Sequence, residues 1–268
     1  MQQKFKILFI GDIVGKNGRK AVQNFLSQNC SNYDFVIANV ENASHGFGLT
    51  RKNHDELLSY GINCFTSGNH IWDKKDIYQY INESDALIRP YNYHPSANGV
   101  GYRVFDNIIV ANFLGKTFMP PIECPFISLE RLINEIKEEL NNKILFIDFH
   151  AEATAEKQCF ARYAKELGAS CVIGTHTHVQ TADEMIIDNK LAYLTDAGFC
   201  GSKNSVIGME YEGSYKRLLT SINERFEVEQ SYPIVFNACE VEFFNNLPQC
   251  IKRISFEYDN NEEKESEN

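Results

Sequence analysis

Residue types that bind transition metals recur at five places along this sequence, and each place follows a short apolar run. The side chains are carboxylates, amides and imidazoles, with no thiolate among them. This mixture of oxygen and nitrogen donors suits Mn, Fe or Zn rather than Ca or a structural zinc site built from cysteines. The five places are Gly11-Asp12, Asn39-Val40-Glu41-Asn42, Gly68-Asn69-His70, Asp148-Phe149-His150 and Gly174-Thr175-His176-Thr177-His178.

The pair His176 and His178 is the most specific of these patterns. Two positions apart on an extended segment, both rings would point to the same side and could reach two ions about 3.5 to 4 Å apart. Glu41 is the natural candidate for a carboxylate shared between such ions. A hydroxide that bridges two divalent ions lies in line with a phosphorus atom whose oxygens the same ions polarise. The pattern therefore predicts hydrolysis at a two-metal centre.

Taken singly, these residues have ordinary structural explanations. Asp12 could cap a helix after a glycine turn, Glu41 could belong to a loop turn, and His150 could be a buried histidine bonded to the backbone. The glycines before Lys16 do not have the spacing of a Walker A phosphate loop. Five strand-end sites with ligand chemistry nevertheless favour one metal centre over five separate structural roles.

Three further histidines do not follow predicted strands. His54 lies in a predicted helix and is expected on the solvated surface. His45 lies in a flexible stretch near Glu41, either as loop filler or as a substrate contact. The segment Tyr91-Asn92-Tyr93-His94 could stack on a base, although exposed tyrosines in loops usually only pack.

The apolar pattern predicts an α/β sandwich, with sheets inside and helices outside. Apolar runs of about five residues alternate with longer amphipathic stretches, which is typical of strands and crossover helices. Ligands bind at the carboxyl ends of strands in open α/β sheets, so the five sites should converge. The predicted strands are 5–10, 35–39, 63–67, 102–105, 108–113, 144–149, 169–173, 185–187, 192–194, 238–244 and 251–258, and the predicted helices are 17–29, 50–61, 129–140 and 155–167.

The composition predicts a soluble, cytoplasmic protein that does not enter a membrane. It is 43% hydrophobic and 23% charged, and no apolar run approaches the roughly 20 residues that span a bilayer. The eight cysteines form no Cys-x-x-Cys motif and are interpreted as reduced core residues. The net charge of −10 argues against a stable nucleic-acid complex but not against a small phosphate substrate held by cations.

The chain of 268 residues can form one domain, which we expect to span residues 1–258. Residues 259–268 are acidic and lack apolar side chains, so we expect them to be a disordered tail. Tyrosine and phenylalanine are frequent enough for a homo-oligomer but locate no interface.

As an ordered set, these motifs resemble the calcineurin-like metallophosphoesterases, and more narrowly the YmdB-like branch. The branch also shares Gly-Asp-Ile-Val-Gly at 11–15 and Val-Glu-Asn-Ala at 40–43. The usual Asp-x-His of the superfamily is here Asp12-Ile13-Val14, and the usual bridging aspartate is replaced by Glu41 beside Asn42. These departures add oxygen ligands, which favours Fe or Mn and leaves Zn as a candidate.

The resemblance implies a metallophosphoesterase fold, two divalent transition-metal ions and a role for each matching residue. It implies that one metal is bound by Asp12, Glu41, Asn42 and His178, and the other by Glu41, Asn69, His150 and His176. His70 would stand beside them as the general acid, and Asp73 or Asp76 could orient its ring. It further implies hydrolysis of small phosphodiesters, notably 2',3'-cyclic nucleotides.

Three alternative functions can be weighed from the sequence. A regulatory or scaffold protein with a structural or vestigial metal site is favoured by the missing histidine after Asp12. A two-metal hydrolase of other bonds is less favoured, because amidohydrolases usually carry His-x-His on the first strand, whereas here it follows a late strand. An RNA-binding module is the least favoured, given the acidic charge and the lack of a basic and aromatic stretch.

Overall fold

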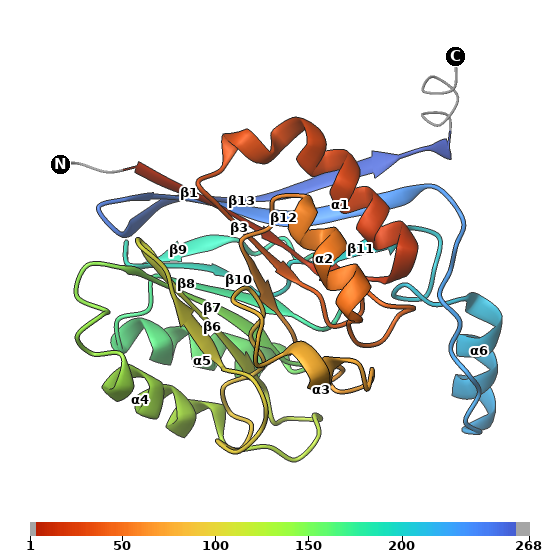
Figure 1. The fold of residues 1–268 in the computed structure, drawn as a ribbon, viewed down its shortest axis with the longest axis horizontal. Coiled ribbons are helices and arrows are strands. Elements are labelled where there is room, and N and C mark those ends of the chain that lie inside the picture. The colour runs from red at the N-terminus through yellow and green to blue at the C-terminus, as the bar shows by residue number, and fades with distance from the viewer. Residues whose placement is uncertain (1–3, 261–268) are drawn as a thin grey trace.

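The computed structural model describes residues 4–260, whose backbone forms two β-sheets packed face to face with helices on the outer sides (Figure 1). The seven-stranded sheet has the order β2-β11-β12-β1-β3-β4, with β13 paired to β12. Its strands are β1 (Lys4–Ile10), β2 (Asp12–Ile13), β3 (Phe35–Asn39), β4 (Cys64–Thr66), β11 (Phe199–Ser202), β12 (Ile234–Phe244) and β13 (Leu247–Tyr258).

The six-stranded sheet has the order β5-β6-β7-β8-β10-β9. Four neighbouring strands in it, β6, β7, β8 and β10, run parallel, as do β1, β3 and β4 in the other sheet. Parallel strands end at the same edge, so residues that follow them lie close together in space. The strands are β5 (Tyr102–Val104), β6 (Ile108–Leu114), β7 (Ile144–His150), β8 (Cys171–Thr175), β9 (Met185–Ile187) and β10 (Leu191–Leu194).

One apolar core joins the two sheets. Side chains on a strand alternate between its faces, and on β1 this directs Ile7 and Phe9 toward the second sheet and Leu8 toward the helices. The rings of Phe9 and Phe146, one from each sheet, have centroids 5.2 Å apart. Strands buried on both faces read as continuous apolar runs, which is why the sequence shows them clearly.

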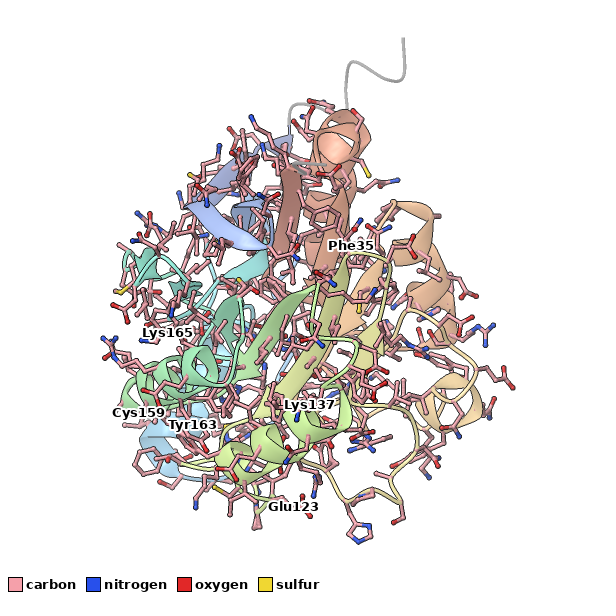
Figure 2. The ribbon with its side chains drawn as sticks, turned by 90° about the vertical axis from the view of Figure 1, so that its left-hand side faces the viewer. Phe35, Glu123, Lys137, Cys159, Tyr163 and Lys165 are labelled. Carbon is pink, nitrogen blue, oxygen red and sulfur yellow. The ribbon has the colours of Figure 1, made fainter. Side chains whose placement is uncertain are left out.

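Helices cover both outer faces of the sandwich. On α1 (Gly15–Asn29), Phe25 stacks on Phe236 of β12 with centroids 4.1 Å apart, and α2 (Arg51–Ser59) lies beside it. The other sheet is covered by α4 (Pro125–Glu135) and α5 (Thr154–Glu166), where Phe160 stacks on Phe149 at 4.0 Å. Figure 2 shows Tyr163 on α5 in front of this sheet. The predicted α/β sandwich in a single domain is therefore confirmed.

Thr50 and Gly61 bound the second helix as predicted. The Thr50 side chain accepts a hydrogen bond from the Asn53 backbone N–H, and Gly61 adopts a left-handed φ of 93°. His54 on this helix is buried, and its Nε2 lies 2.8 Å from the Ser84 hydroxyl. The prediction that His54 is a solvated surface residue was wrong.

Other differences between the predicted and the observed elements occur where an element is incompletely buried or where a capping residue shifts its boundary. The predicted helix 129–140 is observed as α4, which begins earlier because Pro125 starts its first turn, and which ends earlier, at Glu135. Strand β11, the short helix α3 (Ile77–Tyr80) and helix α6 (Tyr211–Thr220) were not predicted. Only Ser214 of α6 is buried, so this helix has no apolar side facing a core.

The described residues bear on three further predictions. Four cysteines are buried as expected, Cys64, Cys171, Cys200 and Cys239, whereas Cys159 and Cys250 are exposed. No helix within residues 4–260 is long and apolar enough to cross a membrane. Most of the predicted disordered tail, residues 261–268, lies outside the described residues, and the domain boundary at 258 stays a prediction.

Candidate metal centre

The carboxyl ends of β1, β3, β4, β7 and β8 bring the predicted ligand residues together. Glu41, His150 and His176 form one group, whose ligand atoms all lie within 4.8 Å of one another. Glu41 Oε1 is 2.9 Å from His150 Nε2, and His150 Nε2 is 3.0 Å from His176 Nδ1. Residues 41, 150 and 176 are distant in the chain, so the convergence arises from the parallel topology.

A second group lies directly beside the first. His178 Nε2 is 3.2 Å from Asn42 Nδ2 and 3.7 Å from Asp12 Oδ1. The two groups meet at Glu41, whose Oε1 is 3.4 Å from Asn42 Nδ2. A carboxylate at this junction is placed to contact two ions.

Three oxygens of this site are buried without any hydrogen-bond partner in the described structure. They are Asp12 Oδ1, Asn42 Oδ1 and Asn69 Oδ1. A buried acceptor left unpaired costs about 1–3 kcal/mol, so three at one place are not explained by packing. A cation that accepts these lone pairs explains all three, and the residues present therefore fit a metal site.

Hydrogen bonds outside the site fix which nitrogen two of the imidazoles present. Thr175 Oγ1 donates to Asp148 Oδ1 at 2.6 Å and so accepts from His150 Nδ1 at 2.9 Å, which directs Nε2 of His150 toward Glu41. In the same way His178 Nδ1 donates to the carbonyl of Ile207 at 2.7 Å. Such outer partners orient metal-binding histidines in many proteins.

The electrostatics of the site favour positive charge. Burial alone would raise the pKa of Asp12, but His178 and His150 outweigh it, and the pKa lies below its usual range. Burial alone would lower the pKa of His150, but Glu41 and Asp12 raise it to about 9. His176 shows the opposite balance, because burial and then the charge of His150 lower its pKa to about 3. The carboxylates of Glu41 and Asp12 thus hold a proton on His150. A metal ion bound at this place could supply the positive charge in place of that proton.

The segment that carries His176 and His178 is not extended, and the reasoning from an extended segment was wrong on this point. β8 ends at Thr175, and the φ angles are 98° at His176 and 63° at His178, both in the left-handed region. Such backbone costs about 1–3 kcal/mol per residue and persists where surrounding contacts enforce it. The two rings consequently reach different groups, His176 beside His150 and His178 beside Asp12.

A buried ion pair holds this segment in place. Lys157 Nζ lies 2.8 Å from Asp196 Oδ2 and donates to the carbonyl of Thr175 at 2.7 Å. Asp196 Oδ2 also accepts from the backbone N–H and the hydroxyl of Thr177. These residues support the two histidines from behind, and no motif in the sequence marked them.

His70 stands at the edge of the metal groups. Its backbone N–H donates to Glu41 Oε2 at 2.9 Å, which ties it to the site, and its Nδ1 lies 2.8 Å from Asp73 Oδ2. Asp73 is therefore the carboxylate that orients the ring, whereas Asp76 Oδ2 accepts from the Arg51 backbone. His70 Nε2 is left as the ring atom free to act on a ligand.

A cavity of about 340 Å³ opens over the site. Its polar side is formed by Glu41, Asn42, His70, His176 and His178, and its apolar side includes Phe47, Ile207, Met209, Leu218 and Phe226. The apolar side was not predicted, because residues in loops and on the exposed helix α6 carry no periodic apolar signal. His45 and His94 do not line this cavity; His45 lines a neighbouring one and His94 is exposed.

Known proteins match this chain over most of its length. The family model described as YmdB-like protein matches residues 8–254. The 2',3'-cyclic-nucleotide 2'-phosphodiesterase of Bacillus subtilis (strain 168) is 41% identical over 231 residues, which cover 84% of this chain and 86% of that protein.

Two crystal structures have the same fold. A hypothetical protein from Thermus thermophilus has a TM-score of 0.88 and 36% identity, and the match covers 94% of this chain and 99% of that one. A novel phosphatase from Mycoplasma pneumoniae has a TM-score of 0.87 and 34% identity, and the match covers 98% of each chain. The family match over residues 8–254 spans every strand end that contributes to the site.

Proposed function

The chain belongs to the YmdB-like family of the metallophosphoesterase superfamily, and on that premise we propose that it hydrolyses small phosphodiesters at a two-metal centre. It is a metal-dependent phosphoric ester hydrolase, in keeping with its phosphodiesterase and phosphatase relatives. The observation that carries the proposal is the set of three buried, unpartnered oxygens beside a Glu-His-His group.

We assign the ligands to two ions that share Glu41. One ion would be held by Asp12, Asn42 and His178, in addition to Glu41. The other would be held by Asn69, His150 and His176, again with Glu41. The 3.4 Å between Glu41 Oε1 and Asn42 Nδ2 supports the junction. The share of oxygen donors favours Fe or Mn, with Zn as the third candidate.

When bound, such a pair of ions neutralises charge on the phosphoryl oxygens and lowers the pKa of a coordinated water. The remaining task falls to His70, which protonates the leaving alkoxide from Nε2 as the P–O bond breaks. Asp73 Oδ2, 2.8 Å from Nδ1, holds the ring in place and leaves Nε2 for the leaving group. General acid catalysis of this kind typically contributes about 10²- to 10⁴-fold in rate.

The proposed substrates are 2',3'-cyclic nucleotides, the class in the name of the Bacillus subtilis relative. A cavity of about 340 Å³ supports a small substrate rather than a long polymer. We further propose a cytoplasmic location, supported by eight free cysteines, of which four are buried.

Replacing His70 tests the assignment. In the presence of Mn²⁺, the purified protein should hydrolyse bis(p-nitrophenyl) phosphate and 2',3'-cyclic AMP, and Asp12→Asn should abolish both activities together with metal binding. His70→Ala should keep both metals and lose about 10²- to 10⁴-fold in kcat. His94→Ala, an exposed histidine outside the cavity, is the matched control. Full activity in His70→Ala would remove its role, and a metal-loaded but inert protein would favour the regulatory alternative.

A further inference from the structure

The cavity over the metal centre has two chemically different sides. The floor carries the acidic and imidazole groups of the candidate metal centre, whereas the opposite side is formed by Phe47, Phe226 and aliphatic side chains. A ligand that matches both sides has an anionic end and an apolar, flat end. A nucleotide has this shape, with its phosphate at one end and its base at the other.

The apolar side is built largely by one segment, residues 205–230, which we call the arm. Figure 1 shows its helix α6 standing away from both sheets. On α6 only Ser214 is buried, and Leu218 is 80% exposed although it lines the cavity. Core packing accounts for Met209, against whose cluster Phe226 and Val228 pack, but it does not account for helix α6. Its base is tied to the metal centre, since His178 donates to the carbonyl of Ile207.

Arg217 differs from the other cations of the arm. Lys216 pairs with Glu224 at 2.6 Å and Arg225 pairs with Glu227 at 3.1 Å. Arg217 lines the cavity and has no carboxylate partner within residues 4–260. Its guanidinium carbon lies 4.6 Å from the centre of the Phe226 ring instead. A guanidinium that lies over an aromatic ring can still donate hydrogen bonds from its N–H groups to a ligand.

We propose that Arg217 and Phe226 form a nucleobase-binding subsite, in which the base stacks against this pair while the phosphate reaches the metal centre. The inference rests on the proposed function and deepens it by assigning the specificity side of the same cavity. Bases stack on aromatic rings and on guanidinium planes, and arginine donates to base acceptor atoms. Phe47 joins the two sides, because its ring lies 4.7 Å from that of His70.

Two cyclic phosphodiesters separate base recognition from phosphate chemistry. One is 2',3'-cyclic AMP, and the other is ethylene glycol cyclic phosphate, which has the same five-membered ring but no ribose or base. Arg217→Gln and Phe226→Leu should each raise KM for 2',3'-cyclic AMP about tenfold or more, as expected for loss of a stacking contact. Both variants should hydrolyse ethylene glycol cyclic phosphate within about twofold of wild type. Lys216→Gln, the adjacent residue, should change neither.

Loss of activity on both substrates to the same extent would show that Arg217 acts on the phosphoryl group and would overturn the subsite, as would unchanged kinetics. Calorimetric binding of 2',3'-cyclic AMP to the metal-loaded protein keeps the test separate from turnover. If wild type proved inert, the proposed function would fail, yet nucleotide binding weakened about tenfold by Arg217→Gln would still support the subsite. Nucleotide binding that ignores both substitutions would overturn it.

Discussion

Gly68→Ala is the sharpest single perturbation of the metal centre. A Cβ at position 68 would lie 2.3 Å from Glu41 Oε2 and 2.5 Å from His150 Nε2, whereas ordinary contact begins at 3.4 Å. At least one of these side chains must therefore move by about 1 Å. Neither can swing into solvent, because their side chains are at most 1% exposed.

The geometry sets the expected magnitude. Metal–ligand distances hold within about ±0.2 Å, so a displacement of about 1 Å removes a ligand rather than stretching its bond. Disturbing even an outer partner of a metal ligand lowers affinity about 10- to 100-fold, which is a lower limit for Gly68→Ala. The fold should lose less, since one added methyl in a packed interior costs about 1–3 kcal/mol.

Metal content after dialysis, measured by inductively coupled plasma mass spectrometry, gives the readout, with urea unfolding of the apo protein beside it. Gly213→Ala is the control, because its new Cβ would meet only the carbonyl of Arg225, at 3.3 Å. We expect Gly68→Ala to retain less than half of the metal of wild type and Gly213→Ala to retain all of it. A folded Gly68→Ala protein with full metal content and turnover would refute the packing of Glu41 against His150.

Three further predictions follow from the supports of the site and from one buried histidine. Thr175→Val removes the hydroxyl that orients His150 and should weaken metal binding about 10- to 100-fold by titration, with little change in shape. Lys157→Met leaves the buried carboxylate of Asp196 without its partner and should lower the free energy of unfolding, measured in urea, by about 3–5 kcal/mol. The control Lys165→Met, at a more exposed ion pair, should lower it by less than about 1 kcal/mol. Equal losses in the two variants would contradict this prediction. Burial lowers the pKa of His54, so below about pH 6.5 the unfolded chain binds a proton at this histidine that the folded protein does not. The free energy of unfolding should therefore fall as the pH falls. In the apo protein, His54→Gln should make the free energy of unfolding less dependent on pH.

The strand ends could be predicted from the sequence because two signals coincide there. Runs such as Ile144–Phe149 are apolar on both faces, which indicates a parallel strand, and a ligand-type residue such as His150 follows directly. Parallel topology then dictates convergence. The same logic located Glu41 and His178, although it could not supply their distances.

The parts that could not be predicted depend on contacts far apart in the chain. The buried pair of Lys157 and Asp196 joins α5 to a loop 39 residues later, and nothing local marks either partner. His54 has the neighbours of a surface residue but is covered by the loop at Ser84. The arm escaped prediction because Arg217 and Phe226 face a cavity, which imposes no period on the sequence.

A crystal structure with anomalous scattering recorded at the Mn, Fe and Zn absorption edges tests the central claim most directly. We predict two ions that share Glu41, one also bound by Asp12, Asn42 and His178 and the other by Asn69, His150 and His176. A single ion elsewhere, or metal-loaded crystals in which these side chains bind no ion, would contradict the account.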